Sequence, residues 1–442
     1  MASTYLTRTP SSAGNRQKWT WSAWIKLGAL GTDRNLFGAY AHSADNLKIN
    51  IADTDQVSIR FYNNTEYQLG LNRIFRDTSA WYHLVFAVDT TLASGGDRFK
   101  IYVNGVRETS FAAANDPTQN LQMTINEATA TQIGRFNTGS YFDGSMSHIN
   151  FIDGTAYDAS YFGSTDATTG EWKINTSPSV TYGTNGFWIL KDGNTITDSS
   201  PNSNNFTLGG GTLTKTEDCP SNVFATLNAL AKPGAGNLPS FGNGNTHYNK
   251  TATGAGNNSM IVATLGATTG KFYYEYKMND SNAFIAGIST LDNTYYDANG
   301  GSMNTASGVG VAYQSSGNKI INGTSTTYGN SYGSGNIVGV AFDLVNNVIY
   351  FSKDGVWQNS GDPTSGSSGT GGIGIATTGI TYSPFAQNNG YNSPSSVYYN
   401  FGNGYFGTTA VASAGTNASG NGIFEYDVPT GYTALSTKGL NL

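Results

Sequence analysis

The strongest constraint on the fold is a hairpin pattern that runs from Gly335 to Trp357, with the sequence G-N-I-V-G-V-A-F-D-L-V-N-N-V-I-Y-F-S-K-D-G-V-W. β-branched and aromatic residues alternate with other residues on both sides of a polar turn at Asp343–Asn347, and this period of two is typical of strands. Asn residues suit this turn because Asn tolerates positive φ. A further turn dipeptide follows at Asp354-Gly355. The segment therefore predicts an antiparallel β-hairpin.

A related hairpin pattern occurs in the first half of the chain. Trp81 to Asp89 reads W-Y-H-L-V-F-A-V-D, and Phe99 to Gly105 reads F-K-I-Y-V-N-G. In both places a strand ends in Asp, a loop follows, and an I-Y strand ends in a turn dipeptide. Two hairpins so far apart predict two β-sandwiches in tandem, rather than a short-period repeat.

Composition supports a β-rich chain with many turns. The 442 residues are enough for two or three domains with separate cores. Only 12% of the residues are charged, 13% are aromatic and 56 are glycines. The net charge of −6, without a long basic run, argues against nucleic-acid binding. Plentiful aromatic residues and a small net charge also argue against disorder.

The cysteine content and the lengths of the apolar runs bear on disulfide formation, membrane insertion and secretion. Cys219 is the single cysteine, so an intramolecular disulfide framework is excluded. No apolar run approaches the roughly 18 residues of a membrane span, and we expect no membrane insertion. The start, M-A-S-T-Y-L-T-R-T-P, lacks the apolar core of a signal peptide.

Four motifs in the first part resemble a laminin-G-like (concanavalin A-like) domain. They are W-T-W-S-A-W-I-K, W-Y-H-L-V-F-A-V-D, I-Y-V-N-G and F-D-G-S-M-S-H-I-N-F, within residues 1–160. Turn signals recur every eight to twelve residues or so, which is the spacing expected of a sandwich. We expect Gly186–Lys191 to return to this sandwich as a strand, because an isolated strand could not bury Trp188.

The second part resembles a SPRY domain over residues 258–406. The motifs G-K-F-Y-Y-E-Y, I-A-G-I-S, G-V-G-V-A-Y, G-N-I-V-G-V-A-F-D, I-Y-F-S-K-D-G and Y-Y-N-F-G occur in that order. The resulting prediction is an all-β chain of two tandem antiparallel sandwiches. Its parts are a laminin-G-like sandwich at 1–215, a connector at 216–257, a SPRY-like sandwich at 258–406 and a C-terminal segment at 407–442, packed on the second sandwich. Ala225–Ala231 is the one expected helical turn.

The layout as a whole resembles virion structural proteins of tailed bacteriophages. The motif D-C-P-S-N-V-F-A-T-L-N and the final F-E-Y-D-V-P-T-G-Y-T-A-L-S-T-K-G-L-N-L carry this likeness. It implies a virion location with assembly in the host cytoplasm, other virion proteins and host-surface carbohydrate as partners, and many copies or a homo-oligomer. We favour a tail appendage for adhesion. Capsid decoration, a polysaccharide depolymerase and a SPRY-type peptide-binding adaptor stay open as alternatives.

The sequence predicts neither catalytic residues nor a cofactor or metal site. His42, His83, His148 and His247 lack metal-ligand spacing, and Cys219 has no CxxC partner. Asp89, Asp143 and Asp153 could hold calcium at a sandwich rim, as in some laminin-G-like domains, but each also fits an ordinary turn. Glu425 and Asp427 have the spacing of paired acids yet lie in the tail, where a solvated strand is the simpler interpretation. The SPRY resemblance implies a framework role for Glu275.

The predicted ligand-binding residues are tyrosines in Gly/Asn/Ser-rich segments of the second part: Tyr295, Tyr296, Tyr332 and Tyr391. Tyrosine among Ser, Gly and Asn is common in binding loops, because it offers a rigid amphipathic area at low entropic cost. Tyr328 lies in a similar segment. The alternative is that these rings cover the sandwich ends or contact a neighbouring subunit.

Overall fold

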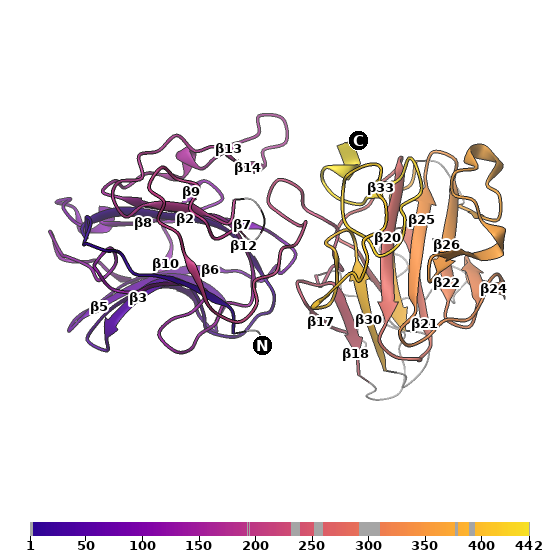
Figure 1. Ribbon diagram of the computed structural model, residues 1–442, viewed down its shortest axis with the longest axis horizontal. Coiled ribbons are helices and arrows are strands. Elements are labelled where there is room, and N and C mark those ends of the chain that lie inside the picture. The colour runs from indigo at the N-terminus through magenta and orange to yellow at the C-terminus, as the bar shows by residue number, and fades with distance from the viewer. Residues whose placement is uncertain are drawn as a thin grey trace. The chain divides into compact units, whose positions relative to one another are not determined.

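The computed structural model describes residues 3–191, 193, 195–230, 239–251, 260–290, 310–375, 379–388 and 394–441. The chain divides into two compact units, Met1–Lys215 and Thr216–Leu442. Both units are built from antiparallel sheets (Figure 1), which confirms the predicted all-β fold. In the part of the chain that the structure describes, no helix is long and apolar enough to cross a membrane.

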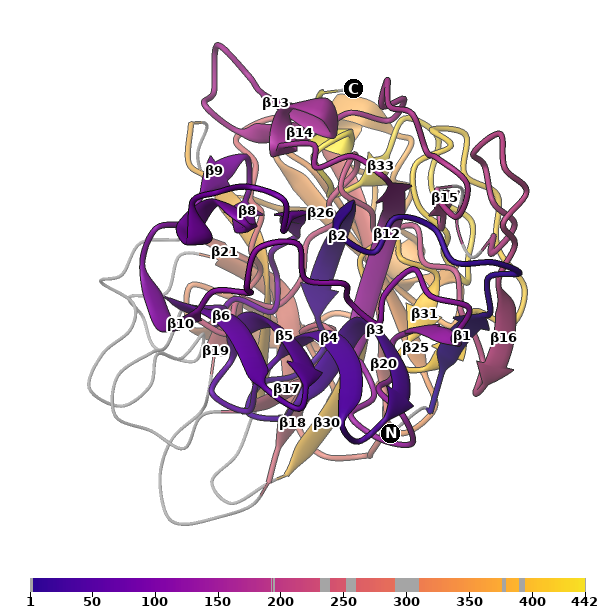
Figure 2. The same ribbon diagram turned by 90° about the vertical axis from the view of Figure 1, so that its left-hand side faces the viewer.

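The first unit is a sandwich of two large sheets. The eight-stranded sheet has the order β10-β6-β5-β4-β3-β11-β1-β16, which can be followed from left to right in Figure 2. Its strands are β1 Tyr5–Arg8, β3 Arg34–His42, β4 Asp45–Ile51, β5 Gln56–Asn63, β6 Glu66–Ile74, β10 Phe111–Asn115, β11 Thr131–Ile133 and β16 Thr207–Gly210.

The six-stranded sheet of this unit has the order β15-β12-β2-β7-β8-β9. Its strands are β2 Lys18–Leu27, β7 Tyr82–Asp89, β8 Phe99–Val103, β9 Val106–Arg107, β12 Gly144–Asp153 and β15 Phe187–Ile189, and the 3₁₀ turn η1 is Gly95–Asp97. The expected return of Gly186–Lys191 is confirmed, because Ile149, Asn150 and Phe151 of β12 pair with β15.

Alternation in W-T-W-S-A-W decides which face of β2 each tryptophan occupies. Trp19 and Trp21 lie in the core between the sheets, together with Phe37 and Phe86. Trp24 lies on the other face of β2, where its ring stacks on His83. A small hairpin, β13 Gly163–Thr165 with β14 Trp172–Ile174, follows the 3₁₀ turn η2 Ala159–Tyr161 and lies outside the six-stranded sheet (Figure 1).

The second unit contains a nine-stranded and a six-stranded sheet. The larger sheet has the order β17-β18-β30-β20-β25-β26-β27, with β28 beside β26 and β33 beside β20, and the smaller has the order β19-β29-β21-β22-β23-β24. The bounds are β17 Ser240–Gly242, β18 His247–Lys250, β19 Met260–Val262, β20 Lys271–Met278, β21 Phe284–Thr290, β22 Gly310–Gln314, β23 Asn318–Ile321, β24 Thr324–Thr327, β25 Ile337–Asp343, β26 Val348–Lys353, β27 Val356–Trp357, β28 Ile373–Gly374, β29 Tyr382–Asn388, β30 Ser395–Asn400 and β33 Thr433–Ala434.

The hairpin predicted at Gly335–Trp357 is confirmed as β25 and β26. The Asp343 carboxylate accepts bonds from the backbone N–H groups of Val345 and Asn346 at 2.9 Å each, which shapes the turn. Asn347 has φ of 56°, as the turn requires. Shorter elements of this unit are β31 Tyr405–Phe406, β32 Thr409–Ala410, η4 Gln358–Ser360, η5 Gly366–Ser368 and η6 Gly439–Asn441.

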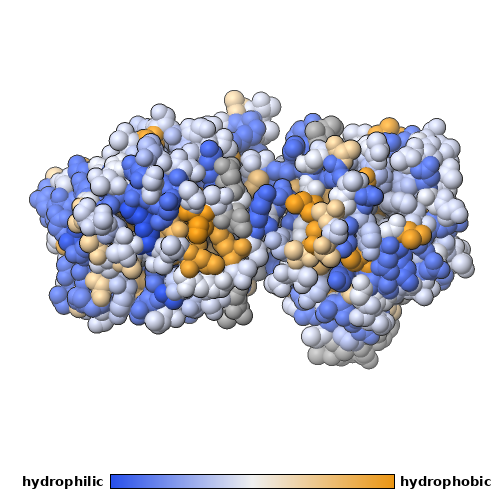
Figure 3. Space-filling view, in the orientation of Figure 1, coloured by the Kyte–Doolittle hydropathy of each residue, from blue (hydrophilic) through white to orange (hydrophobic). Residues whose placement is uncertain are grey.

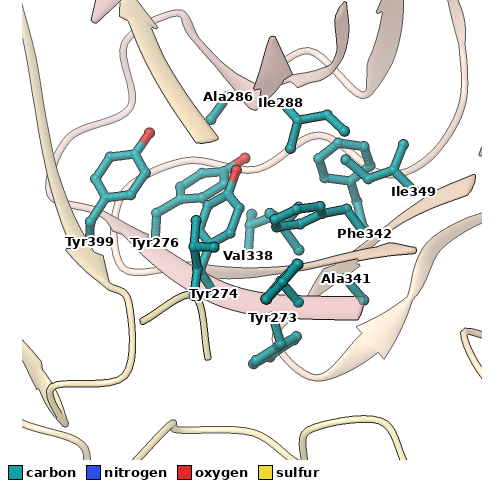
Figure 4. Close-up of a cluster of buried hydrophobic side chains, with 14 of the residues drawn as sticks. Tyr273, Tyr274, Tyr276, Ala286, Ile288, Val338, Ala341, Phe342, Ile349 and Tyr399 are labelled. Atoms are coloured by element: carbon teal, nitrogen blue, oxygen red, sulfur yellow. The ribbon is translucent and has the colours of Figure 1, made fainter. Parts of the chain in front are cut away.

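The core of the second unit is rich in tyrosine, and β20 shows why. Its residues alternate between the sandwich interior and the outer face of the sheet. Figure 4 shows Tyr274 and Tyr276 on one side of the strand and Tyr273 on the other. Some of the buried hydroxyls donate to backbone oxygens, as in the 2.8 Å bond from Tyr274 to Gly287 O and the 3.1 Å bond from Tyr399 to Phe385 O.

The C-terminal segment packs on the second unit, as expected. β33 runs parallel to β20, and Phe424, Tyr432 and Leu435 belong to the hydrophobic core. The rings of Phe424 and Tyr273 meet edge to face, with centroids 5.0 Å apart. The outer face of β20 is therefore covered by residues from the end of the chain.

The expected helical turn at Ala225–Ala231 is wrong for its described part. Phe224 forms a bridge with Ser436, and Leu227 forms one with Ala263. Ala225 N–H donates to Leu435 O at 2.9 Å, and both Ala225 and Leu227 are buried. Tertiary pairing with the C-terminal segment overrides the helical propensity of A-T-L-N-A-L-A, because extended backbone satisfies its polar groups through these partners.

Candidate functional site

Tyr332, which we predicted to bind ligand, lies in the core and not on an exposed loop. Its exposed fraction is 5%. Tyr276 OH donates to Tyr332 OH at 2.9 Å, and Tyr332 OH donates to Tyr313 O at 2.9 Å. Tyr328 is also buried, against Phe351. These rings fill the interior of the sandwich, so they offer no area for a ligand.

The other predicted ligand-binding residues, Tyr295, Tyr296 and Tyr391, lie outside the described residues. A site built from geometry has to be sought elsewhere.

The carboxylates considered for calcium make protein contacts. Asp89 pairs with Lys18 at 3.2 Å, and Asp143 is exposed. Asp153 is buried and accepts bonds from Asn15 N at 2.8 Å and Asn185 N at 3.0 Å, so it holds loops together. Among the residues that the structure describes, no three His, Cys, Asp or Glu side chains are grouped to hold a metal ion.

His83 and Ser22 form the arrangement that most resembles a catalytic dyad. Ser22 Oγ lies 2.9 Å from His83 Nε2, and both residues are buried. On the other side of the ring, the Trp172 indole N–H donates to His83 Nδ1 at 3.0 Å. Because Nδ1 accepts, the neutral ring carries its proton on Nε2 and donates it to Ser22.

This tautomer cannot take a proton from Ser22, which a general base in a nucleophilic dyad has to do. Burial lowers the pKa of His83 to about 3, with a smaller contribution from the charge of His148. The geometry therefore gives His83 a structural role, as the sequence spacing of the histidines indicated.

Glu275 is buried on the outer face of β20, under the C-terminal segment. Glu425 N and Tyr426 N donate to its two carboxylate oxygens at 2.8 and 2.9 Å, and Tyr273 OH donates at 3.0 Å. Burial raises the pKa of Glu275 to about 7, while these bonds oppose the rise. The carboxylate serves as an anchor for the chain end, in line with the framework role that we expected.

Glu425 and Asp427 do not form an acid pair on a solvated strand. Glu425 Oε2 accepts from Ala412 N at 2.7 Å, and Asp427 Oδ1 accepts from Thr416 N at 2.6 Å. Each carboxylate thus holds a separate turn of the C-terminal segment. The bonds to Thr416 lower the pKa of Asp427.

The strongest candidate for a binding site is the outer face of the eight-stranded sheet. Core residues such as Leu47, Ile49 and Phe61 point inward from β4 and β5. Strand alternation therefore places the residues between them on the opposite face. The register aligns these outer residues in three rows: Tyr40-Asn46-Tyr62-Glu66, Gln132-Gly38-Lys48-Arg60-Gln68-Asn115 and Asn50-Ser58-Gly70-Ala113.

An aromatic corner closes one end of this outer face. Phe136 lies over Gly38, where an added Cβ would come within 3.3 Å of its ring. The Phe136 and Tyr40 rings meet edge to face at 5.6 Å, and Lys48 Nζ lies 5.7 Å from the Phe136 centroid. The glycine in β3 thus makes room for an aromatic ring on the sheet surface.

The charges on the outer face are balanced in pairs. Arg60 Nε donates to Glu66 Oε1 at 2.7 Å, and their side chains are 41% and 42% exposed. Lys48 Nζ lies 3.7 Å from Asp33, which also accepts from Asn50 Nδ2 at 2.6 Å. Burial lowers the pKa of Lys48, and Asp33 opposes this shift. Ion pairs joined to amide side chains hold the polar groups in fixed positions.

Such a face suits a ligand with many hydroxyl groups. Amides, an exposed guanidinium and a carboxylate can donate and accept in adjacent positions, and Tyr62, 38% exposed, offers a ring beside them. Figure 3 shows that hydrophilic residues cover much of the visible side of the first unit, around one apolar patch. The described outer-face residues include no serine or cysteine paired with a base.

Sequence reasoning missed the outer-face residues, although part of the signal was present. Polar residues alternate with apolar ones in N-L-K-I-N-I and in V-S-I-R-F-Y. This pattern assigns Lys48 and Arg60 to a solvent face. It does not show that they lie directly opposite each other, because the register depends on the intervening turns.

Comparison with known families supports both resemblances. Residues 2–160 match the Concanavalin A-like lectin/glucanases superfamily, and residues 271–371 match the SPRY domain. The first unit thus carries a concanavalin A-like domain and the second a SPRY domain. No curated protein sequence matches the chain.

Similar solved structures cover single parts of the chain. The SPRY domain of human HERC1 is 17% identical over 35% of this chain and 87% of its own, with a TM-score of 0.27. Domain 4 of AbnA, an extracellular arabinanase from Geobacillus stearothermophilus, is 17% identical over 32% of this chain and 64% of its own, with a TM-score of 0.27. A SAP-like pentraxin from Limulus polyphemus is 11% identical over 48% and 91%, with a TM-score of 0.28.

Proposed function

We propose that the protein is a non-enzymatic adhesion protein that binds surface glycans through the outer face of its eight-stranded sheet. The observation that carries this proposal is the first two of the three polar rows, in which amides and ion-paired side chains lie beside Tyr40, Tyr62 and Phe136. Asn50 and Ser58 of the third row are buried and bond to each other. A sugar presents hydroxyls for such amides and a C–H face for an aromatic ring. The match of residues 2–160 to a lectin and glucanase superfamily agrees with this ligand class.

A polysaccharide depolymerase is the competing function within the same superfamily. A glycosidase needs two carboxyl groups about 5–10 Å apart, one as an acid and one as a base or nucleophile. The carboxylates of the outer face, Asp33 and Glu66, are each held in an ion pair with a neighbouring cation. Their engagement favours adhesion without turnover. Reducing-end release from host polysaccharide, abolished by Glu66→Gln, would instead establish the depolymerase.

Glycan binding is tested on a microarray of surface glycans with the full chain and two variants. Arg60→Ala and Tyr62→Ala remove exposed side chains from the centre of the face, and we expect each to lower binding at least tenfold. Val106→Ala, on β9 of the other sheet, is the control, because Val106 is 64% exposed and should not contribute. Undiminished binding by both outer-face variants would place the glycan elsewhere.

We further propose that this adhesion protein is a tail appendage of a bacteriophage virion, with capsid decoration as the second position. The layout of the chain supports this, including the connector motif and the final segment that resemble virion proteins. These two segments contact each other, since Ala225 N donates to Leu435 O and Thr437 N to Val223 O, at 2.9 Å each. A β-rich protein without a disulfide framework also suits assembly in a reducing cytoplasm.

Antibody labelling of intact particles under the electron microscope tests the location. Label on the tail is the expected result, and label over the capsid would move the protein to the head. Particles without label would refute the virion location. The protein would then have to bind glycans from a place other than the virion.

A further inference from the structure

A second exposed aromatic surface lies on the opposite sheet of the first unit. Residues between β12 and β15 cross the outer face of the six-stranded sheet. Their apolar side chains, among them Ala159 and Phe162, pack on Val85 and Ile152. The crossing segment forms a third layer, and its own outer surface faces away from the sheet.

Three contacts fix this third layer to the sheet. Thr20 Oγ1 donates to Thr155 O at 2.8 Å and accepts from Tyr157 N at 2.7 Å. The Trp172 indole N–H donates to His83 Nδ1 at 3.0 Å. Asp158 caps η2 by accepting from Ser160 N at 2.9 Å. Side chains on this layer are therefore held in place before any ligand arrives, which lowers the entropic cost of binding.

Tyr157, Asp158 and Tyr161 lie on the partly exposed side of this layer, with Tyr102 of β8 beside them, and we name these four residues the tyrosine ledge. The Tyr157 and Tyr161 rings lie with centroids 4.3 Å apart at 49°, and Tyr161 is 41% exposed. Tyr102 packs against the same cluster, and its pKa is raised by burial and by the nearby Asp158 carboxylate. Asp158, which is exposed, uses Oδ1 to accept from Ser160 N and Ser160 Oγ in the cap.

We propose that the tyrosine ledge is a second glycan site, which takes one neutral hexopyranose ring. The exposed Tyr161 ring offers its face to the C–H side of a sugar, and the adjacent Asp158 carboxylate can accept a hydrogen bond from a sugar hydroxyl. The site is separate from the outer face of the eight-stranded sheet and stands without it.

Charge selects a neutral sugar over an acidic one. Asp158 contributes a negative charge at the ledge, while Arg107 and Asp97 act on Tyr102 in opposite senses. The nearby cations are already paired, Lys173 with Asp166 at 2.7 Å and Arg107 with Asp97 at 3.0 Å. A uronic or sialic acid carboxylate would therefore lie beside the like charge of Asp158.

Saturation-transfer NMR with the full chain tests this proposal, with methyl glycosides of glucose, galactose and mannose as probes and methyl glucuronide as the acidic comparison. We expect transfer to one face of at least one neutral glycoside and a loss of at least fivefold in affinity for Tyr161→Ala. Tyr161→Phe keeps the ring and should retain most of the binding. Tyr62→Ala, at the other proposed sugar site, is measured in parallel, and Val345→Ala is the control, because Val345 is 60% exposed and lies in the second unit.

The variants separate the two sites. Transfer that survives Tyr161→Ala but disappears in Tyr62→Ala would overturn the ledge and leave the outer face as the sugar site. The reverse pattern would support the ledge and count against the outer face. Absence of transfer to every neutral glycoside, or a stronger response from the glucuronide, would overturn the ledge. If Tyr161→Ala unfolds, Asp158→Asn tests the ledge instead, because this variant keeps the cap. We expect Asp158→Asn to weaken sugar binding about threefold. Unchanged affinity in this variant would contradict the proposal.

Discussion

Glu275 shows how a single buried carboxylate can organise a chain terminus. Its exposed fraction is 0%, and two consecutive backbone N–H groups of the C-terminal segment donate to it. An ionised carboxylate satisfies such donors well, yet its burial is costly. The balance raises the pKa of Glu275 from 4.5 to about 7, with burial as the largest cause.

The raised pKa predicts how the second unit responds to pH. The folded state binds the Glu275 proton more tightly than the unfolded state, so this residue contributes stability that is present below pH 4.5 and is lost as the pH rises through about 7. The difference is about 3 kcal/mol at most. Glu275→Gln abolishes the titration, and the free energy of unfolding relative to this variant should favour the wild type more at pH 5 than at pH 8.

Hydrogen exchange followed by mass spectrometry checks this prediction in the full chain, through peptides that cover β20 and residues 424–434. A difference between wild type and Glu275→Gln that stays constant from pH 5 to pH 8 would contradict a titration of Glu275 in this range.

The lowered pKa of His83 predicts that acidification destabilises the first unit. The pKa of His83 falls from 6.5 to about 3, chiefly through burial, so the neutral ring stabilises the fold above pH 6.5 and this contribution is lost on acidification. At pH 5 we expect a loss of about 2 kcal/mol in unfolding free energy relative to pH 7. His83→Gln can still donate to Ser22 and accept from Trp172, but it does not titrate. Thermal unfolding at pH 7 and pH 5 should show a smaller decrease in this variant, and an equal decrease would assign the pH effect to other groups.

Tyr332 illustrates why site residues were hard to predict one at a time. Its neighbours in sequence are Gly, Ser and Asn, which indicated a surface loop. The partners that bury it, Tyr276 and Tyr313, lie 56 and 19 residues away. The composition of a local segment does not reveal contacts with residues so far away in the sequence. It therefore could not show whether Tyr332 lies in the core or on the surface.

At the scale of elements, the hairpins could be predicted because their signals are local. Alternation and turn residues specify β25 and β26 together, and β7 and β8 in the same way. The outer face of the eight-stranded sheet could not be predicted, since it joins β3 to β6 with β11 across register shifts in β3 and β5. The same limitation explains the wrong helical prediction at Ala225 and Leu227, whose partners Leu435 and Ala263 lie 210 and 36 residues later.

A substitution at Asn421 tests whether this side chain holds the connector and the C-terminal segment together in the second unit. The Asn421 side chain is buried, accepts from Asn222 Nδ2 at 2.8 Å and donates to Thr433 Oγ1 at 2.9 Å and Ser436 Oγ at 3.1 Å. Asn421→Ala leaves several buried groups unsatisfied and should cost about 2–3 kcal/mol in unfolding free energy.

Limited proteolysis of the full chain measures this effect, and we expect Asn421→Ala to become cleavable both near residue 222 and after residue 430. Asn318→Ala, on β23, serves as a control that loses one bond on the surface. Cleavage at only one of the two segments would show that they are not held together by Asn421.

At the scale of the whole molecule, the chain joins two sandwiches with different interiors and different pH responses. Acidification from pH 7 to pH 5 withdraws a contribution of His83 from the first unit and adds one of Glu275 to the second. The described surface of the first unit offers polar and aromatic groups on both of its large sheets. Two weak sugar sites on one unit, repeated over many copies, would give strong attachment through multivalency.

The most direct test of glycan binding is a crystal structure of the full chain with the glycan that binds most strongly on the array. We expect difference density for a sugar over β4, β5 and β6, with hydroxyls within hydrogen-bonding distance of Arg60 and a ring beside Tyr62. Density for this glycan at any other place, with the outer face of the eight-stranded sheet left bare, would contradict it.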